Sequence, residues 1–209
     1  MAISVEKTPV PLAILISGRG SNMRAIGEAV DEGRLRAVVR VVVSNRADAP
    51  GLQWARDAGI ETLVLPHRDY DSREAFDRAL VDALTTRGVR LVCLAGFMRL
   101  LSPLFFDAFP QAVLNVHPSL LPAFPGKDAQ AQALAHGVKV SGVTVHFVTP
   151  ELDAGPIIQQ AAVPVREDDT CETLSARILV EEHRVYPEAI QRVIDGGWRV
   201  DGRRVVMPS

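Results

Sequence analysis

The sequence predicts an α/β fold: an open, mostly parallel, twisted sheet with helices on both faces and an antiparallel C-terminal extension. One observation is that short apolar runs alternate with segments of helical spacing as far as about residue 116. Strands that alternate with helices join through right-handed crossovers into a parallel sheet. The other observation is that polar and apolar residues alternate after Gly142, as they do in antiparallel strands. We expect one domain, residues 12–209, behind a flexible N-terminal lead-in of residues 1–11.

Five apolar runs are expected to form the parallel strands. Such strands are covered on both faces, so their residues are apolar almost without interruption. The runs are residues 12–17, 38–44, 60–66, 89–96 and 112–116. In the extension, residues 143–148 and 157–165 are expected to pair as antiparallel strands. The Asp-Gly turn at residues 201–202 predicts a final hairpin at residues 200–206.

Helices are expected between these strands. The segment behind Asp71 has apolar residues at helical spacing, and Glu74 three residues later resembles a capping box. Gly88 is expected to end this helix. A long helix with one apolar face is expected from about Thr170 to Asp195. The other expected helical segments are residues 23–31, a short helix ending at Gly59 and a broken connection at residues 98–109.

Composition excludes several classes of partner. The 209 residues contain 23 Lys and Arg against 25 Asp and Glu, a net charge of −2, so we expect neither nucleic acid nor an anionic membrane as a partner. No apolar run approaches the length of a membrane span, and the N-terminal residues lack the apolar core of a signal peptide. Two cysteines, Cys93 and Cys171, are too few for a disulfide framework. We therefore expect a cytoplasmic protein.

Three unusual segments each follow an expected parallel strand. They are residues 17–22 (SGRGSN), 96–101 (GFMRLL) and 115–122 (NVHPSLLP). Open parallel sheets bind ligands beyond the carboxyl ends of their strands. We therefore expect the three segments to meet along one edge of the sheet.

The first of these segments has the composition of an anion-binding turn. Gly18 and Gly20 flank Arg19, and Ser21 and Asn22 lead into a helix. Small residues let backbone N–H groups approach an anion, which the N-terminal end of a helix also attracts. The segment lacks the third glycine of the dinucleotide fingerprint and the Gly-Lys-Ser/Thr of a Walker loop. A single phosphate monoester is the expected ligand, and a plain glycine turn is the alternative.

Asn115 and His117 are candidates for catalysis. Their side chains lie on the same face of a strand, because successive side chains alternate. An amide donor beside an imidazole suits a developing oxyanion, and the imidazole can also move a proton. Pro118 would make the exit of the chain stiff. The alternative is a satisfied histidine at a strand end, with Asn115 serving the turn.

A second polar turn lies at residues 151–156 (ELDAGP) and carries Glu151 and Asp153. A carboxylate there could orient His117 or move its proton through water. An ordinary Asp-x-Gly loop is the alternative.

The other histidines and the cysteines give weaker signals. No histidine has the spacing of a metal motif such as H-E-x-x-H, so no metal is expected. His146 faces away from Val145 and Phe147, and is either a supporting residue of a site or exposed. Cys93 is expected in the core. Cys171 begins a helix but has no base tied to it by sequence, so we do not interpret it as a nucleophile.

Taken together, the segments resemble the phosphoribosylglycinamide formyltransferase family, the folate-dependent enzymes of purine biosynthesis, from about residue 12 to residue 194. The segments that carry the resemblance are SGRGSN (17–22), AGFMRLL (95–101), LNVHPSLLPAFPG (114–126), GVTVHFVTPELDAGP (142–156) and EEHRVYPEA (181–189). The Asn-x-His-Pro-Ser-Leu-Leu-Pro stretch is shared with other 10-formyltetrahydrofolate enzymes. The Gly-x-Gly-Ser-Asn loop narrows the resemblance to the phosphoribosylglycinamide formyltransferase family. The fold implied is the Rossmann-like formyltransferase fold.

The resemblance implies a formyl transfer from the co-substrate 10-formyltetrahydrofolate to the amine of glycinamide ribonucleotide, without a metal. It places the catalytic residues of the family on Asn115, His117 and Asp153. The residues implied for the ribonucleotide are Gly18, Arg19, Gly20, Ser21, Asn22 and Glu182. The residues implied for the folate are Arg73, Met98, Arg99, Leu100, Leu101, Asn115, Val148 and Asp153. Residues 127–134 (KDAQAQAL) and Leu179 depart from the family pattern, and both a monomer and a homodimer are compatible with it.

Three other functions remain open on the sequence. A formyltetrahydrofolate deformylase would use water in place of the amine, but such relatives usually carry an N-terminal regulatory domain, and only residues 1–11 are expected before the first strand here. A methionyl-tRNA formyltransferase would call for a C-terminal RNA-binding domain and basic charge. A non-enzymatic nucleotide-binding module would bind a phosphate ligand and lose nothing when His117 is changed.

Overall fold

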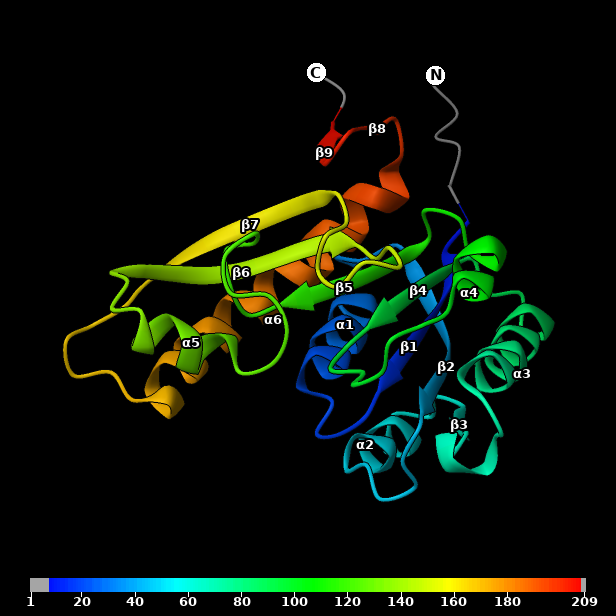
Figure 1. Ribbon diagram of the computed structural model, residues 1–209. Helices are drawn as coiled ribbons and strands as arrows, with labels where there is room; N and C mark the ends of the chain where they lie inside the picture. Colours follow the sequence, from blue (N-terminus) through cyan, green and yellow to red (C-terminus); the bar gives the residue numbers. More distant parts are fainter. Residues whose placement is uncertain (1–7, 208–209) are drawn as a thin grey trace, which may run out of the picture.

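A single mixed sheet organises the computed structural model, which describes residues 8–207 (Figure 1). Within this range the strands are β1 (Val10–Ile16), β2 (Ala37–Ser44), β3 (Thr62–Val64), β4 (Leu91–Leu94), β5 (Val113–His117), β6 (Val140–Phe147), β7 (Ile157–Pro164), β8 (Arg199–Asp201) and β9 (Arg204–Val206). Their order is β3-β2-β1-β4-β5-β6-β7-β9-β8. Neighbours from β3 to β5 run parallel, whereas β6 is antiparallel to both β5 and β7. The predicted α/β fold with its antiparallel extension is confirmed, and β8 and β9 form the expected hairpin.

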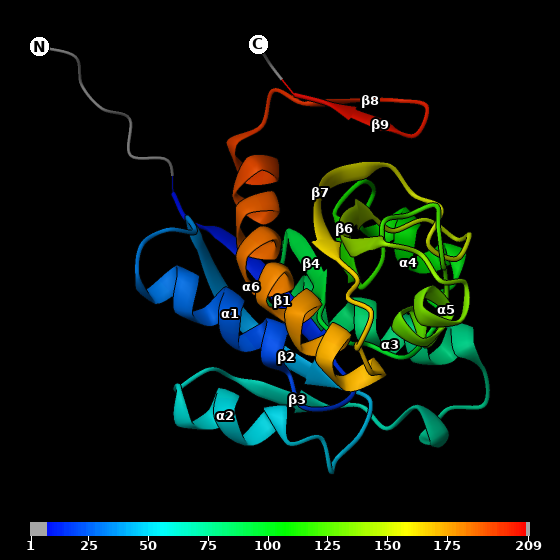
Figure 2. The ribbon, with the colours of Figure 1, turned by 90° about the vertical axis from the view of Figure 1, so that its left-hand side faces the viewer.

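Helices cover both faces of the sheet (Figure 2). They are α1 (Ser21–Asp31), α2 (Gly51–Asp57), α3 (Arg73–Thr86), α4 (Pro103–Ala108), α5 (Ala129–Ala135) and α6 (Cys171–Asp195), with a short 3-10 helix η1 (His67–Asp69). Apolar residues of α1, α2, α5 and α6 pack in one core cluster, and those of α3 and α4 pack in the other. No helix within residues 8–207 is long and apolar enough to cross a membrane.

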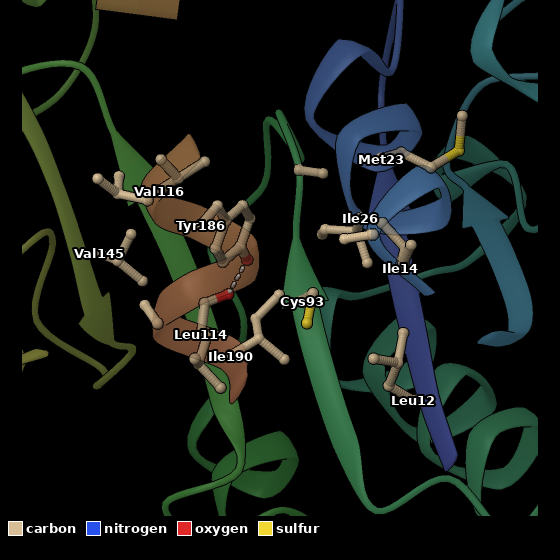
Figure 3. Packing of buried hydrophobic residues seen from close by; sticks show 14 of the residues in the cluster. Leu12, Ile14, Met23, Ile26, Cys93, Leu114, Val116, Val145, Tyr186 and Ile190 are labelled. Atoms are coloured by element: carbon tan, nitrogen blue, oxygen red, sulfur yellow. Dashed lines mark hydrogen bonds between the residues drawn. The ribbon is translucent and has the colours of Figure 1, made fainter. Parts of the chain in front are cut away.

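The larger core cluster lies between α6 and the central strands (Figure 3). Cys93 of β4 is fully buried there, as expected, and burial raises the pKa of its thiol to about 12. Tyr186 of α6 is also fully buried, and its hydroxyl lies 3.0 Å from the carbonyl oxygens of both Leu94 and Leu114. This shared hydrogen bond fixes α6 over the end of β4 and the start of β5.

Several predicted boundaries were wrong. The first strand begins at Val10 rather than at residue 12, and residues 1–7 of the expected lead-in lie outside the described residues. β3 covers three residues instead of the seven predicted. The cap of α3 is Ser72 and not Asp71: the Ser72 hydroxyl accepts the N–H of Ala75 at 3.0 Å. Propensity and spacing place such ends only within a few residues.

The strand order creates a crevice between β1 and β4. β1 and β4 are neighbours in the sheet. The next strand after β1 is β2, which pairs on one side of the two, and the next strand after β4 is β5, which pairs on the other side. Ligands of open α/β sheets bind at such a reversal, beyond the carboxyl ends of the strands. Residues 17–22 meet Ala95, Gly96 and Met98 at this point, and together they line one pocket.

Candidate active site

The end of β5 presents two polar side chains on one face of the strand. Asn115 is half-buried, and His117 is 5% exposed. Val116 between them points to the other face and joins the core. β5 pairs with β6 so that Asn115 lies opposite His146, and His117 lies opposite Thr144. The antiparallel neighbour therefore sets what surrounds both candidate residues.

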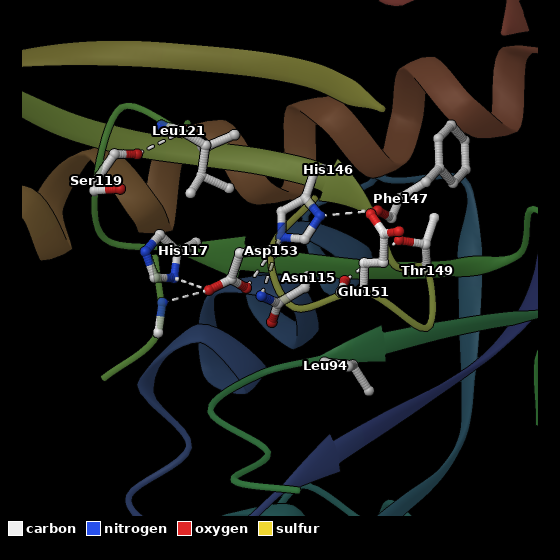
Figure 4. A network of polar contacts seen from close by, with 12 residues as sticks. Leu94, Asn115, His117, Ser119, Leu121, His146, Phe147, Thr149, Glu151 and Asp153 are labelled. Atoms are coloured by element: carbon white, nitrogen blue, oxygen red, sulfur yellow. Dashed lines mark hydrogen bonds and ion pairs between the residues drawn. The ribbon is translucent and has the colours of Figure 1, made fainter. Parts of the chain in front are cut away.

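Both ring nitrogens of His117 face oxygen atoms. Nε2 lies 2.9 Å from the carbonyl oxygen of Phe124, which can only accept, so Nε2 carries a proton. Nδ1 lies 3.4 Å from Oδ2 of Asp153 (Figure 4). A protonated ring can donate to both oxygens, and a ring that lacks the Nδ1 proton can receive one at that position.

Asp153 lies in the turn after β6 in a left-handed conformation, with φ of 49°. Asp adopts this conformation more readily than most residues because its short polar side chain bonds locally. Its Oδ2 atom accepts the N–H of Gly126 at 2.7 Å, and its side chain is 8% exposed. This contact joins the turn to the loop behind β5, and so brings the carboxylate to His117.

His146 completes this cluster, although the sequence left its role open. It is 1% exposed, and its Nδ1 atom donates to the carbonyl oxygen of Phe147 at 2.8 Å. Nε2 is therefore an acceptor, and it receives a hydrogen bond from Nδ2 of Asn115 at 3.3 Å. Burial lowers the pKa of His146, against the raising effect of the Phe147 bond, which favours this neutral form. The signal in the sequence was the alternation on β6, but the register with β5 was needed to use it.

The loop from His117 to Gly126 is held by side chains of the neighbouring strands. Thr144 of β6 donates its hydroxyl to the carbonyl oxygen of Ser119 at 2.7 Å and accepts the N–H of Leu121 at 3.0 Å. Gln160 of β7 donates to the carbonyl oxygen of Leu121 at 3.0 Å. The prediction of a stiff exit from β5 is consistent with these bonds, which hold residues 119–121 directly after the strand.

The segment SGRGSN lines a pocket at the carboxyl end of β1. This pocket has a volume of about 410 Å³. Its lining residues are Ser17, Gly18, Arg19, Gly20, Ser21, Asn22, Asn45, Arg46, His67, Ala95, Gly96 and Met98. Gly20 takes a left-handed conformation with φ of 72° immediately before α1, where glycine avoids the strain of a side chain. The sequence missed Asn45, Arg46 and His67, because they follow other strands.

Asn22 and Glu182 connect the pocket to α6. Nδ2 of Asn22 donates to Oε2 of Glu182 at 2.6 Å, and both residues are 8% exposed. Oδ1 of Asn22 is buried and has no hydrogen-bond partner among residues 8–207. Burial raises the pKa of Glu182, against the lowering effects of Asn22 and the nearby His117. Asn115, His117 and Asp153 do not line the pocket, but Glu182 lies between the two groups.

The residues expected at the folate lie on two loops. Met98 and Leu100, after β4, are 69% and 54% exposed. Val148, after β6, is half-buried. Leu101 differs, because its side chain is 6% exposed and packs in the core with Phe105. Exposed apolar side chains of this size favour contact with an apolar ligand.

Two arginines expected on the folate side lie near a buried carboxylate. The guanidinium of Arg99 lies 5.1 Å from the ring centroid of Phe76, and Arg73 is the first residue of α3. Asp77 of α3 is fully buried and accepts the N–H of Ser102 at 2.5 Å. Burial raises the pKa of Asp77, while the bond to Ser102 and the charges of Arg99 and Arg73 oppose this rise. The loop between β4 and α4, which carries Arg99, is thereby fixed to α3, which begins with Arg73.

The site combines hydrogen-bond donors, a proton carrier and a carboxylate within a small volume. Asn115 has a second amide N–H beyond the one given to His146. Such a group suits a carbonyl oxygen that gains negative charge. Within residues 8–207, no group of three or more His, Cys, Asp or Glu side chains is arranged to hold a metal ion. The arrangement is suited to acyl transfer between two bound molecules.

Comparison with known proteins identifies similar chains. The family model described as Formyl transferase matches residues 10–190. The phosphoribosylglycinamide formyltransferase of Escherichia coli strain K12 is 46% identical over 192 residues, which are 92% of this chain and 88% of that protein. The trifunctional purine biosynthetic protein adenosine-3 of Bos taurus is 46% identical over 197 residues. The match covers 94% of this chain but 20% of the bovine protein, so the chain spans about a fifth of that relative.

A solved structure is similar over the whole chain. The glycinamide ribonucleotide transformylase 1 of Symbiobacterium toebii is 53% identical, with a TM-score of 0.97. The match covers 100% of this chain and 99% of that one. Backbone and sequence agree on the same group of relatives.

Proposed function

The chain belongs to the formyl transferase family, and from this premise we propose that it transfers the formyl group of 10-formyltetrahydrofolate to the amine of glycinamide ribonucleotide. The products are formylglycinamide ribonucleotide and tetrahydrofolate, in purine biosynthesis. Relatives named for this activity support the proposal. The observation that carries it is the cluster of Asn115, His117 and Asp153 at the end of β5, with Nδ1 of His117 3.4 Å from Asp153.

The proposed reaction is a direct attack of the amine nitrogen on the formyl carbon. The carbonyl oxygen becomes an oxyanion, which the free N–H of Asn115 and a protonated His117 stabilise. His146 orients the amide of Asn115 through the 3.3 Å hydrogen bond to Nδ2. The bond from the formyl carbon to N10 of the folate then breaks. No covalent bond to the protein forms, and much of the rate comes from holding two substrates together.

One proton must move in this reaction. The attacking amine loses a proton, and N10 of the folate gains one as it leaves. The 3.4 Å between Nδ1 of His117 and Asp153 exceeds the usual hydrogen-bond length of about 2.7–3.2 Å. The hydrogen bond from Nδ1 of His117 to Asp153 is therefore weak, and the substrate oxygen can compete for the Nδ1–H. Asp153 stabilises the charged ring and assists the proton transfer, directly or through water.

We assign the binding residues by their place around the cluster. Gly18 to Asn22 hold the phosphate of the ribonucleotide, and Glu182 accepts from its ribose. The folate lies against Met98, Leu100 and Val148. Arg73 and Arg99 lie on its anionic side, and Asn115 and Asp153 contact its formyl end. Leu101 contributes through its backbone, since its side chain is in the core.

Three further expectations stay predictions. Residues 12–209 act as one formyltransferase domain, and the protein works in the cytoplasm. It acts on small molecules as a monomer or a homodimer.

The absorbance change of the folate, followed with and without glycinamide ribonucleotide, tests the proposal. We expect turnover only with the amine, and formate release without it would favour the hydrolase.

His117→Ala is expected to lower kcat by at least about 10²-fold, the lower range for general acid–base catalysis, with an unchanged circular dichroism spectrum. His136→Ala is the control, because His136 is exposed at the end of α5. Near-normal turnover by His117→Ala would refute the assignment.

A further inference from the structure

A chain of hydrogen bonds crosses the carboxyl ends of β4, β1 and β2. The N–H of Met98 donates to the hydroxyl of Ser17 at 2.9 Å, and this hydroxyl donates to Oδ1 of Asn45 at 2.6 Å. Nδ2 of Asn45 lies 3.2 Å from Nδ1 of His67. Ser17 and Asn45 are 8% and 5% exposed, so water competes little for these bonds. His67, in η1 after β3, is the last member of the chain.

The direction of this chain fixes the form of His67. The N–H of Met98 can only donate, so the hydroxyl of Ser17 has its own proton free for Oδ1 of Asn45. The amide nitrogen of Asn45 must then face His67, and it donates to Nδ1. Nδ1 of His67 also lies 3.4 Å from the carbonyl oxygen of Asn45, a longer contact in which Nδ1 would have to donate. The shorter contact with the amide favours a neutral His67 that carries its proton on Nε2. This N–H has no hydrogen-bond partner among residues 8–207.

His67 lines the same pocket as residues 17–22, which we call the glycine loop. Arg19 and Arg46 line the same pocket, and no aspartate or glutamate is among its lining residues. Arg46 pairs with Asp48 at 2.8 Å, but both side chains are exposed. The pocket therefore offers backbone donors, two cations and the Nε2 proton of His67 to an anion.

We propose that His67 is a specificity-determining residue whose Nε2–H donates a hydrogen bond to the phosphate of the amine substrate. Arg46 adds positive charge on the same side of the pocket. This inference rests on the proposed function, because it takes a phosphorylated amine as the substrate. The glycine loop contacts the phosphate from α1, and His67 contacts it from the direction of β3. Ser17 and Asn45 are positioning residues that hold the imidazole in its donor form.

The inference makes a prediction that a general binding defect does not make. The contribution of His67 exists only when the substrate carries a phosphate. His67→Ala is expected to raise KM for glycinamide ribonucleotide roughly ten- to hundredfold, the range for a lost hydrogen bond to a charged group. KM for glycinamide riboside, which lacks the phosphate, is expected to change less than about twofold. KM for the folate and kcat at saturation are expected to stay near the parent values, because His67 lies outside the catalytic cluster.

Two variants sharpen the test. Arg68→Ala is the matched control, because Arg68 is in the same 3-10 helix, is exposed and does not line the pocket. It should leave every KM unchanged. His67→Gln keeps a side-chain N–H at this position and is expected to recover part of the loss. Inorganic phosphate is the binding probe: its inhibition constant against the ribonucleotide should rise in His67→Ala and not in Arg68→Ala.

The possible failures are distinct. If the parent enzyme does not formylate the ribonucleotide, the proposed function fails. If the parent is active but His67→Ala keeps its KM for the ribonucleotide within about twofold, the role of His67 is wrong. An equal rise of KM for the ribonucleotide and for the riboside would also overturn it, because that result indicates a structural effect on the whole pocket.

Discussion

At the residue scale, the site depends on which atoms donate and which accept. The carbonyl oxygen of Phe147 fixes the proton of His146 on Nδ1. Nε2 of His146 then accepts from Asn115 and turns the amide nitrogen, rather than the amide oxygen, toward the cluster. One carbonyl in the backbone of β6 thus determines the orientation of the proposed oxyanion donor on β5.

His146→Ala is expected to lower kcat roughly 10- to 100-fold, less than the about 10²–10³-fold lost when an oxyanion donor is deleted. Asn115 stays in place but loses the acceptor that orients its amide. Both KM values should change little, because His146 contacts neither proposed substrate. His146→Gln offers an acceptor oxygen and should recover part of kcat. Steady-state kinetics of the three proteins at one pH near neutrality test this, and a loss confined to KM would contradict it.

The same residue gives a pH dependence to stability. Burial lowers the pKa of His146 in the folded protein, so the unfolded chain takes up this proton at a higher pH than the folded protein does. The stabilisation by the neutral ring is therefore present above the ordinary histidine pKa of about 6.5 and is lost as the pH falls through the folded value. Glutamine does not titrate. In urea unfolding between about pH 7 and pH 5, His146→Gln should lose less stability on acidification than the parent, and equal slopes would argue against a neutral His146.

Sequence reasoning found Asn115 and His117 and did not place His146 or His67. The first two stand out because polar residues end an apolar strand beside a proline. The alternation on β6 correctly separated His146 from Val145 and Phe147, but both faces of β6 are buried in the sheet. Whether such a residue reaches a site depends on the pairing of β5 with β6, which local pattern does not contain.

At the element scale, α6 links the core to the site. Glu182 and Tyr186 are four residues apart, so they lie on the same face of the helix. Tyr186 bonds the carbonyl oxygens of Leu94 and Leu114, and Glu182 bonds Asn22 at the start of α1. One helical face therefore contacts the end of β4 and the start of β5 and orients Asn22 in the segment after β1.

Tyr186→Phe is expected to lower the free energy of unfolding by about 1–3 kcal/mol, because two buried carbonyl oxygens lose a donor. Urea unfolding measures this change. Tyr70→Phe is the matched control, since Tyr70 is the other tyrosine of the chain and packs its ring on Phe76. Tyr70 is partly buried and makes no side-chain hydrogen bond within residues 8–207, so the loss of its hydroxyl is expected to change the free energy of unfolding by no more than about 0.5 kcal/mol. Equal losses in both variants would show that the bonds to Leu94 and Leu114 contribute little.

The elements were more predictable than their ends. Apolar runs marked β1, β2, β4 and β5 because strands buried on both faces leave a continuous signal. β3 lies at the outer edge of the sheet and pairs with β2 alone through three residues, so the apolar run around it extends beyond the strand. Ser72 rather than Asp71 caps α3, a choice between adjacent residues that both suit a cap. The strand order was not predicted, because it depends on packing across the whole sheet.

At the scale of the whole molecule, no single segment builds the site. Residues 17–22 follow β1, His67 follows β3, Met98 follows β4, His117 ends β5 and Asp153 follows β6. These residues come together only because the strands pair in one sheet. A substrate that binds them therefore binds the folded protein and not the unfolded chain, and its binding free energy adds to the stability of the fold.

Glycinamide ribonucleotide at about 100 times its Kd is expected to stabilise the folded protein by about 2.7 kcal/mol. For a chain of about 150–250 residues, each kcal/mol raises Tm by about 2–4 °C, so a rise of roughly 5–10 °C is expected. Thermal unfolding at that concentration measures the shift.

Asn22→Ala should show a clearly smaller shift at the same ligand concentration, because it removes both the bond to Glu182 and the unpaired Oδ1 atom. The free Asn22→Ala protein, measured alone, separates this effect from a change in intrinsic stability. If the parent gains no Tm from the ribonucleotide while the folate raises it, the ribonucleotide does not bind, and the proposed function is wrong. Equal shifts in parent and variant would mean that the ribonucleotide binds in the pocket without Asn22.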